Sequence, residues 1–257
     1  MKKCSLDMVV SANIPLGSNH FLLKFTHKEQ LPEMLPGQFV QVRVDNAPGV
    51  FLRRPISVNF VDQQKNELWL LVQKVGEGTR KMSEYKTGDV VNMLLPLGNS
   101  FTMPQSAQSR LLLVGGGVGI APLLYMGSLL KQQGCNPMFL LGARSADGLM
   151  QIDDFKQFGE VFITTEDGSA GEKGFVTQHS KLQEHIDKIY TCGPTPMMQA
   201  VARFAQNNDI ECEASLENKM ACGFGACLCC VTQTQSGHKC VCSEGPVFNT
   251  KELSWQI

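Results

Sequence analysis

The sequence of 257 residues predicts a multi-domain β and α/β protein with three parts. We expect an antiparallel β-barrel over residues 1–104, a parallel α/β domain over residues 105–210, and a small cysteine-rich subdomain over residues 211–257. Short β-rich runs between turn residues predict the barrel, and alternating strand and helix patterns predict the α/β domain. The last part follows neither pattern and concentrates cysteine, which sets it apart.

The predicted barrel ends near Ser100. Its candidate strands are runs rich in β-branched, leucine and aromatic residues: 21–25, 39–44, 67–72 and 90–94. Turn residues such as Pro36-Gly37 and Lys86-Thr87-Gly88-Asp89 separate these runs. Several short strands at this spacing favour a small antiparallel barrel, and only residues 78–84 have a helical pattern.

The alternating pattern begins near Ser109. The predicted strands are 110–114, 138–141, 160–165 and 188–191. The predicted helices are 121–133, 153–158 and 196–207. This alternation indicates a parallel sheet with crossover helices. We expect the pattern to stop near Ile210, where the cysteine-bearing tail begins.

The tail holds four cysteines at an informative spacing: Cys222, Cys227, Cys230 and Cys242. The pattern is C-x4-C-x2-C with a fourth cysteine after eleven residues, which is typical of a plant-type [2Fe–2S] cluster. Small residues between the first two cysteines, such as Gly223 and Gly225, let the backbone curl and aim N–H groups at cluster sulfurs. A one-electron centre makes electron transfer the leading hypothesis, and the cluster would hold this short tail together.

Other interpretations of the cysteines stay open from spacing alone. Zinc also takes four cysteines, although its sites usually show two CxxC-like pairs and only Cys227 and Cys230 have that spacing here. Unliganded thiols are a further possibility, and disulfides are the weakest one. We treat Cys229 as a non-ligand because it would break the spacing. Cys240 is an alternative to Cys242 as the fourth ligand.

A glycine-rich run follows the first strand of the predicted α/β domain. The candidate nucleotide-binding residues in it are Gly115, Gly116, Gly117 and Gly119. A strand, a glycine turn and a helix N-terminus make a pyrophosphate site, because N–H groups and the positive end of the helix dipole face the ligand. The run departs from GxGxxG, since the third glycine would fall at Ile120, and turns without ligands also use glycine.

Two later strand ends support nucleotide binding. Glu166 and Asp167 follow the third strand, and Cys192-Gly193-Pro194 follows the last one. Ligands of open α/β sheets bind at the carboxyl ends of strands, where both segments would lie. A carboxylate there would accept a hydrogen bond from a ribose hydroxyl and would repel a 2′-phosphate, which favours NAD over NADP. The alternatives are a solvated acidic loop and a tight turn whose proline begins a helix.

Composition excludes several functional classes. A net charge of −1 indicates no polyanion-binding surface, so we expect no nucleic-acid partner. No run approaches the ~18–20 apolar residues of a membrane span. Asp7 and the polar Ser11-Ala12-Asn13 interrupt the start before the apolar core of a signal peptide forms. Ten cysteines without secretion fit a reducing compartment, so we expect a cytoplasmic protein without membrane contact.

Four motifs occur in a specific order along the chain: Arg54-Pro55-Ile56-Ser57, Gly76-Glu77-Gly78-Thr79, Gly115–Pro122, and the cysteine tail followed by Gly245-Pro246-Val247-Phe248. In this order they resemble the ferredoxin–NADP reductase superfamily. Within it, the chain is most similar to the electron-transfer subunits of type B dihydroorotate dehydrogenase. The resemblance covers essentially the whole chain.

The resemblance implies which residues bind which cofactor. The Arg54-Pro55-Ile56-Ser57 motif would contact FAD, with Arg54 at the pyrophosphate and Ser57 near the isoalloxazine. Backbone N–H groups of Gly78 and Thr79 would bind the same pyrophosphate. The Gly115–Pro122 run would bind NAD(H) as co-substrate, and Cys192 would lie near the point where nicotinamide meets flavin. The three parts thus become an FAD-binding barrel, an NAD-binding domain and a [2Fe-2S] tail.

The expected function is an electron relay. NADH would reduce FAD, and the [2Fe–2S] cluster would pass electrons outward one at a time. No acid or base is assigned, since hydride transfer needs none. The resemblance implies an FMN-containing catalytic subunit that oxidises dihydroorotate to orotate in pyrimidine biosynthesis, in an α2β2 heterotetramer. The alternatives are the same relay with a ferredoxin, hydrogenase or other oxidoreductase, and a zinc- or redox-responsive regulatory module.

An interface is the expected use of the apolar residues in the tail, because no region remains to bind an organic substrate. These residues are Phe224, Leu228, Val247, Phe248 and Trp255. They would equally serve as a small core for the tail itself.

Overall fold

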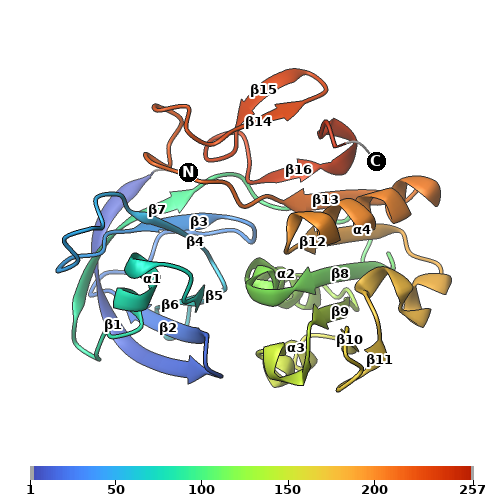
Figure 1. The fold of residues 1–257 in the computed structure, drawn as a ribbon, viewed down its shortest axis with the longest axis horizontal. Coiled ribbons are helices and arrows are strands. Elements are labelled where there is room, and N and C mark those ends of the chain that lie inside the picture. The colour runs from blue at the N-terminus through green and yellow to red at the C-terminus, as the bar shows by residue number, and fades with distance from the viewer. Residues whose placement is uncertain (1–2, 256–257) are drawn as a thin grey trace.

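The computed structural model describes residues 3–255, and it has two lobes joined by a tail that crosses both (Figure 1). One lobe is an antiparallel sheet, and the other is a mostly parallel sheet between helices. The cysteine-bearing segment lies along one edge of each sheet (Figure 1). The multi-domain β plus α/β class predicted from the sequence is confirmed.

The first lobe is a seven-stranded antiparallel sheet in the order β4-β3-β7-β1-β2-β6-β5. Its strands are β1 Cys4–Leu16, β2 His20–Thr26, β3 Phe39–Val42, β4 Arg54–Ser57, β5 Phe60–Asp62, β6 Glu67–Gln73 and β7 Val90–Leu97. The single helix, α1, spans Glu77–Met82 close to its predicted position. β4 also lies against β6, so the sheet curls into a half-barrel.

Alternation along β2 explains why this sheet has two apolar faces. Phe21, Leu23 and Phe25 point into the core of the half-barrel. Leu22 points the other way and packs in the core of the α/β lobe, together with Leu71 of β6. Successive side chains of a strand alternate between faces, so β2 and β6 contribute to both cores. This shared burial holds the two lobes together.

The second lobe has the order β11-β10-β9-β8-β12-β13-β16, and only β16 is antiparallel to its neighbour. Its strands are β8 Leu111–Gly116, β9 Met138–Ala143, β10 Glu160–Thr165, β11 Glu172–Lys173, β12 Lys188–Cys192, β13 Glu211–Ser215 and β16 Val247–Asn249. Its α-helices are α2 Ala121–Gln132, α3 Ile152–Lys156 and α4 Thr195–Asn207. Short 3-10 helices are η1 Gly117–Ile120, η2 Ala146–Gly148, η3 Val176–Gln178, η4 Ser180–Gln183 and η5 Thr250–Glu252.

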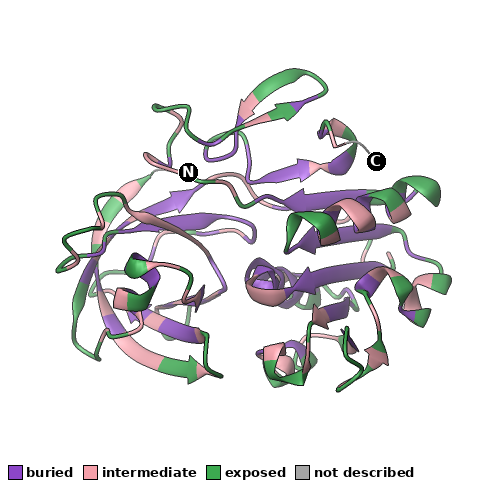
Figure 2. Ribbon diagram, in the orientation of Figure 1, coloured by how far each residue is buried: buried purple, intermediate pink, exposed green. Residues whose placement is uncertain are grey.

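The central strands of this lobe are buried on both faces (Figure 2). Leu111 and Leu113 of β8 pack toward α2, whereas Leu112 and Val114 pack toward α4. Helices therefore cover both faces of the sheet, as the predicted crossover connections require. The proline in the first turn of α2 and of α4 fits helix starts that follow strand ends directly.

One expectation about the tail is wrong. The strand pattern does not stop near Ile210, because β13 continues the sheet beside β12 over Glu211–Ser215. Its sequence lacks β-branched residues, so its pattern gave no strand signal. Tertiary pairing overrides that weak propensity. β16, from the far end of the tail, then adds to β13. The domain boundaries at residues 104 and 210 stay a proposal. β13 and β16 follow the second boundary in the chain, but they belong to the sheet of the second lobe.

A buried polar cluster ties the linker between the lobes to β12 and β13. The Lys188 ammonium lies 3.3 Å from the Glu213 carboxylate and donates to the Thr102 hydroxyl over 2.5 Å. Glu213 also accepts from the Thr102 N–H at 2.9 Å. A buried carboxylate needs such partners, so these contacts fix the linker against the sheet.

No helix within residues 3–255 is long and apolar enough to cross a membrane.

Candidate functional site

The loop that starts at Cys222 points its backbone at a sulfur atom. Burial alone would raise the pKa of the Cys222 thiol. The N–H groups of Phe224, Cys227 and Ala226 oppose burial and lower that pKa to about 6. Such N–H groups stabilise a thiolate, which is the form that ligates iron. The predicted curl of the small-residue loop is therefore present.

The four predicted ligand thiols lie in two pairs. Cys222 and Cys227 share a hydrogen bond. Cys230 and Cys242 form the other pair, and the Cys242 N–H donates to the Cys230 sulfur over 3.3 Å. Among residues 3–255, no three side chains stand together as a set for one metal ion. A [2Fe–2S] cluster takes four protein ligands, two at each of its irons, so the two pairs fit that group.

Cys229 and Cys240 lie near these pairs in different surroundings. Cys229 is exposed, as is the predicted ligand Cys227, so its treatment as a non-ligand stays a prediction from the spacing. Cys240 is buried at the end of β15 (Gly237–Cys240), which pairs with β14 (Val231–Thr234), and its N–H donates to Glu244 over 2.6 Å. The Gly225 N–H donates to the Cys242 sulfur over 3.1 Å. These contacts support Cys242 as the fourth ligand, and the assignment stays a prediction.

The glycine run and the turn after β12 meet at the carboxyl ends of adjacent strands. A Cβ on Gly119 would lie 2.5 Å from the nitrogen of Gly193, and a Cβ on Gly116 would lie 2.6 Å from the sulfur of Met197. At Gly115, a Cβ would crowd Leu123. These glycines thus let two chain segments approach each other closely. Gly117 differs, since its Cα faces open space and its φ is +56°.

Cys192 lies under this turn and is fully buried. Burial and the charge of Glu217 raise the pKa of its thiol well above the usual range, against a lowering hydrogen bond with Ser215. The thiol therefore stays protonated. Its predicted position near the nicotinamide stays a proposal.

Glu217 is a residue that the sequence patterns did not single out. Glu217 is exposed on the fold, yet the protein atoms near its carboxyl group desolvate it and raise its pKa. It lies two residues after the end of β13 and is close enough to Cys192 to affect that thiol. Only its position after a strand end would have identified it, and that strand was not predicted.

The acidic loop after β10 also lies at the carboxyl end of the sheet. The Asp167 carboxylate accepts from the N–H and the hydroxyl of Ser169, at 2.9 and 2.6 Å, and these bonds lower its pKa. The Glu166 N–H donates to Ala143 at the end of β9. Glu166 itself is exposed. The loop is ordered by its own turn, and its role toward a ribose stays a proposal.

The candidate flavin residues are brought together on the half-barrel. A Cβ on Gly78 would lie 2.7 Å from the Arg54 guanidinium, so that side chain lies directly over the start of α1. The Thr79 hydroxyl accepts from the N–H groups of Val75 and Gly76. Within β4, Ile56 packs toward the core, and alternation turns Pro55 and Ser57 to the opposite face. A positive guanidinium beside a glycine backbone fits a pyrophosphate.

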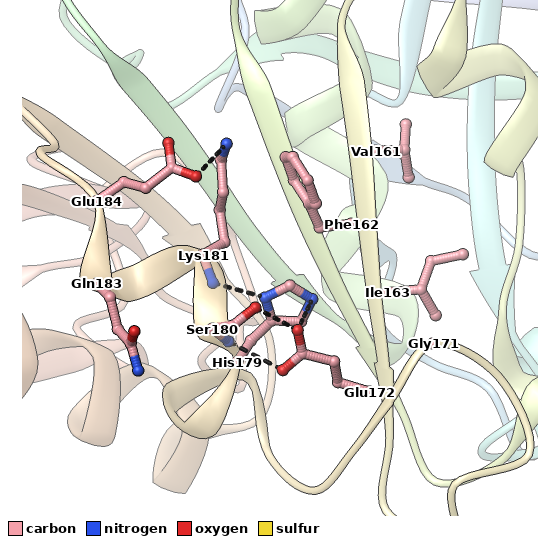
Figure 3. Close-up of a pocket in the computed structure, with 10 residues that line it drawn as sticks. All are labelled: Val161, Phe162, Ile163, Gly171, Glu172, His179, Ser180, Lys181, Gln183 and Glu184. Atoms are coloured by element: carbon pink, nitrogen blue, oxygen red, sulfur yellow. Dashed lines mark hydrogen bonds and ion pairs between the residues drawn. The ribbon is translucent and has the colours of Figure 1, made fainter.

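A hollow with a volume of about 730 Å³ lies elsewhere, beside β10 and β11 (Figure 3). Its polar groups bind one another. Ser180 donates to Glu172 through both its N–H and its hydroxyl, and the His179 Nδ1 accepts from the Lys181 N–H at 3.0 Å. Since the serine faces the carboxylate rather than the histidine, this set lacks the nucleophile–base contact of a hydrolase. We therefore place the functional site at the cysteines and glycine turns.

Two family models match the chain. Residues 217–254 match the iron–sulfur cluster binding domain of dihydroorotate dehydrogenase B, and residues 113–203 match an oxidoreductase NAD-binding domain. The first covers all four predicted ligands. The second covers the glycine run, the acidic loop and the turn after β12.

Similar curated proteins carry one name, dihydroorotate dehydrogenase B (NAD(+)), electron transfer subunit. The protein from Fusobacterium nucleatum is 36% identical over 96% of this chain and 97% of its own length. The protein from Caldanaerobacter subterraneus is 39% identical, over 95% of this chain and 96% of its own length. Matches of this length extend to the half-barrel, which neither family model covers.

Solved structures are similar as well. A chain from the structure of the NADH-dependent reduced ferredoxin–NADP oxidoreductase has a TM-score of 0.87 and 32% identity, and covers 97% of this chain and 90% of its own length. The ferredoxin reductase of carbazole 1,9a-dioxygenase has a TM-score of 0.69 at 22% identity, over 82% of this chain and 67% of its own, and shares the fold.

Proposed function

This chain belongs to the family of dihydroorotate dehydrogenase B electron transfer subunits, and on that premise we propose that it relays electrons between NAD(H) and a catalytic partner subunit. Its cofactors are FAD and a [2Fe–2S] cluster. The partner we propose contains FMN and oxidises dihydroorotate to orotate in pyrimidine biosynthesis, within a cytoplasmic α2β2 heterotetramer.

The paired thiols of the tail carry this proposal. Cys222 with Cys227, and Cys230 with Cys242, supply four sulfur ligands, and backbone N–H groups already point at three of these sulfurs. The cluster loop packs against β3 of the half-barrel. β3 pairs with β4, which carries the candidate flavin motif. The cluster and the flavin would therefore lie on neighbouring elements.

The chain's own residues bind and orient the redox groups. The bound groups supply the chemistry, which is two-electron exchange with NADH at the flavin and one-electron transfer at the cluster. Arg54, Gly78 and Thr79 would hold the flavin pyrophosphate, and Pro55 and Ser57 would face the ring while Ile56 anchors this strand in the core. The open face at Gly117 would receive the nicotinamide nucleotide, and Glu166 and Asp167 would repel a 2′-phosphate.

The cluster loop exposes apolar side chains, and this supports the proposal of a protein partner. Phe224 and Leu228 are 49% and 63% exposed, and Val231 at the start of β14 is exposed as well. Exposed apolar side chains grouped on one loop are typical of an interface. The other three candidates pack against the protein. Val247 and Phe248 lie buried in the cores that join the tail to the lobes, and Trp255 is half-buried against the core under the tail.

An anaerobic absorbance titration of the purified chain with NADH, repeated with NADPH, tests the relay. We expect NADH to bleach both flavin and iron–sulfur absorbance, and NADPH to do so far less effectively. A colourless protein that stays silent after reconstitution with FAD and iron would overturn the relay. Co-purification with the FMN subunit should then give NAD-dependent dihydroorotate oxidation, and its absence despite full cofactors would remove the partner assignment.

A second candidate is the same relay with another oxidoreductase partner. The 32% identity to a chain of the NADH-dependent reduced ferredoxin–NADP oxidoreductase favours this alternative. Adding a reduced ferredoxin or the FMN subunit to the NADH-reduced chain separates the two candidates. Electron exchange with the FMN subunit alone supports the first, and exchange with ferredoxin alone supports the second.

A further inference from the structure

Gln41 in the middle of β3 has a side chain whose polar atoms lack partners. The residue is 0% exposed. Within residues 3–255, neither its amide nitrogen nor its amide oxygen has a hydrogen-bond partner. A buried carboxamide without partners is unfavourable, and such groups usually meet a ligand or an ordered molecule. This amide is therefore a candidate for contact with a bound group.

The position of Gln41 indicates which group that is. Val40 and Val42 point into the core of the half-barrel, so Gln41 points outward, as does Phe39, which packs in the core under the tail. A Cβ on Gly223 would lie 2.6 Å from the Gln41 Cγ and 2.8 Å from its amide nitrogen. The cluster loop therefore lies directly on this side chain, one residue from Cys222.

The neighbouring strand brings the flavin motif to the same place. Gln41 pairs with Pro55 of β4 and with Leu94 of β7. Pro55 and Ser57 share the outward face with Gln41, so this amide lies between the cluster loop and the candidate flavin ring site. The loop contacts the Gln41 side chain directly at Gly223. Its thiolates are acceptors that need N–H donors, which an amide supplies.

We propose that the Gln41 carboxamide donates a hydrogen bond to a sulfur of the [2Fe–2S] cluster, either the Cys222 thiolate or a bridging sulfide. This inference rests on the proposed function, because it needs the cluster. The cluster gains one electron on reduction and no bond forms or breaks. A donor stabilises the added negative charge, so the bond raises the reduction potential of the cluster.

The test is a redox titration of the holoprotein followed by EPR of the reduced cluster. Gln41→Met keeps the length of the side chain and removes the donor. We expect the ratio of reduced to oxidised cluster at a given potential to fall about tenfold, which for one electron is about 59 mV. Gln38→Met is the matched control on the same chain segment. Gln38 is also buried, but its amide is satisfied by Leu35 and Gly98.

A cluster potential that Gln41→Met leaves unchanged overturns the inference, as does an equal shift in Gln38→Met. A shift in the flavin potential alone assigns the amide to the flavin and overturns it too. Pulsed EPR of the unmodified protein labelled with amide-15N glutamine gives an independent result, since we expect a nitrogen coupling to the reduced cluster, and its absence overturns the inference.

The experiment distinguishes a failure of the proposed function from a failure of this inference. A protein without any [2Fe–2S] signal overturns both the proposed function and this inference. A normal signal that is insensitive to Gln41 overturns the inference alone.

Discussion

The cluster loop and the glycine turn use the same two residue types for opposite purposes. In the loop, N–H groups lower the pKa of Cys222 to about 6, and Gly225 donates to Cys242. In the turn, Cys192 is buried away from solvent, which raises the pKa of its thiol. Gly119 allows the backbone to contact Gly193 closely. The dipoles and solvent around each residue decide its role, so a cysteine or glycine count alone does not locate a site.

The largest expected effect is the loss of the cluster on removal of one ligand. Cys227→Ser should abolish iron–sulfur absorbance and lower electron transfer to a downstream acceptor by more than about 100-fold, since even supporting groups of a metal site are worth 10–100-fold. NADH reduction of a dye through FAD should persist. Absorbance spectra and the two activities measure this.

Cys229→Ser is the control for that variant, because Cys229 is exposed and lies one residue from a predicted ligand. It should retain the cluster. A cluster that survives Cys227→Ser and disappears in Cys229→Ser would reverse the ligand assignment and break the contrast between loop and turn.

Lys188→Met should show whether the cluster loop and the glycine turn unfold together as one cooperative unit. It leaves the Glu213 carboxylate buried without its charged partner, so we expect a loss of about 3–5 kcal/mol in unfolding free energy. That corresponds to a fall in Tm on the order of 10 °C. Far-UV circular dichroism and cluster absorbance should change together on heating, because β12 carries the turn and its neighbour β13 leads into the tail.

The exposed pair of Lys251 and Asp209 supplies the control, and Lys251→Met should change stability by less than about 0.5 kcal/mol. Two separate melting transitions in Lys188→Met would mean that the tail is an independent unit, contrary to the shared strands.

Gly119→Ala should sharpen the distinction between packing and ligand glycines. Its new methyl group would collide with the backbone of Gly193, which we expect to cost about 1–3 kcal/mol and to weaken NADH binding. Gly134→Ala is a control with open space and a φ of +82°, so it should cost about 1 kcal/mol from backbone strain alone. Chemical denaturation and NADH titration measure both variants. Unchanged NADH affinity in Gly119→Ala would place the nucleotide elsewhere.

Alkylation should give the smallest disturbance, because it leaves the fold intact. In the native holoprotein, Cys229 should react first with iodoacetamide and Cys192 only after unfolding. Only the thiolate reacts, and the raised pKa of Cys192 keeps the thiolate scarce even at pH 8. Mass spectrometry of the adducts reports the order. Native labelling of Cys192 at the rate of Cys229 would contradict its burial, and Cys229→Ser should remove the fast adduct.

Several elements followed from local sequence. The cysteine spacing, the glycine run before Ala121-Pro122 and the alternation of strands and helices involve neighbours along the chain. The predicted strands and helices of the α/β lobe therefore lie close to their observed positions. β1 was missed, although it is a 13-residue strand, because its polar and apolar residues alternate irregularly around a bulge between Val10 and Ala12. β13 and β16 were missed because long-range pairing, rather than propensity, makes them strands.

The sequence by itself indicated the iron–sulfur and nucleotide sites, because ligand spacing and glycine turns are local properties of the chain, and the order of its motifs implied FAD through the family resemblance. Only the tertiary structure decided which groups surround them. It paired Cys230 with Cys242, sealed Cys192 beside Ser215 and placed the Gln41 amide under Gly223. Each of these contacts joins residues from different elements, and burial and hydrogen bonding depend on that packing rather than on the residue type.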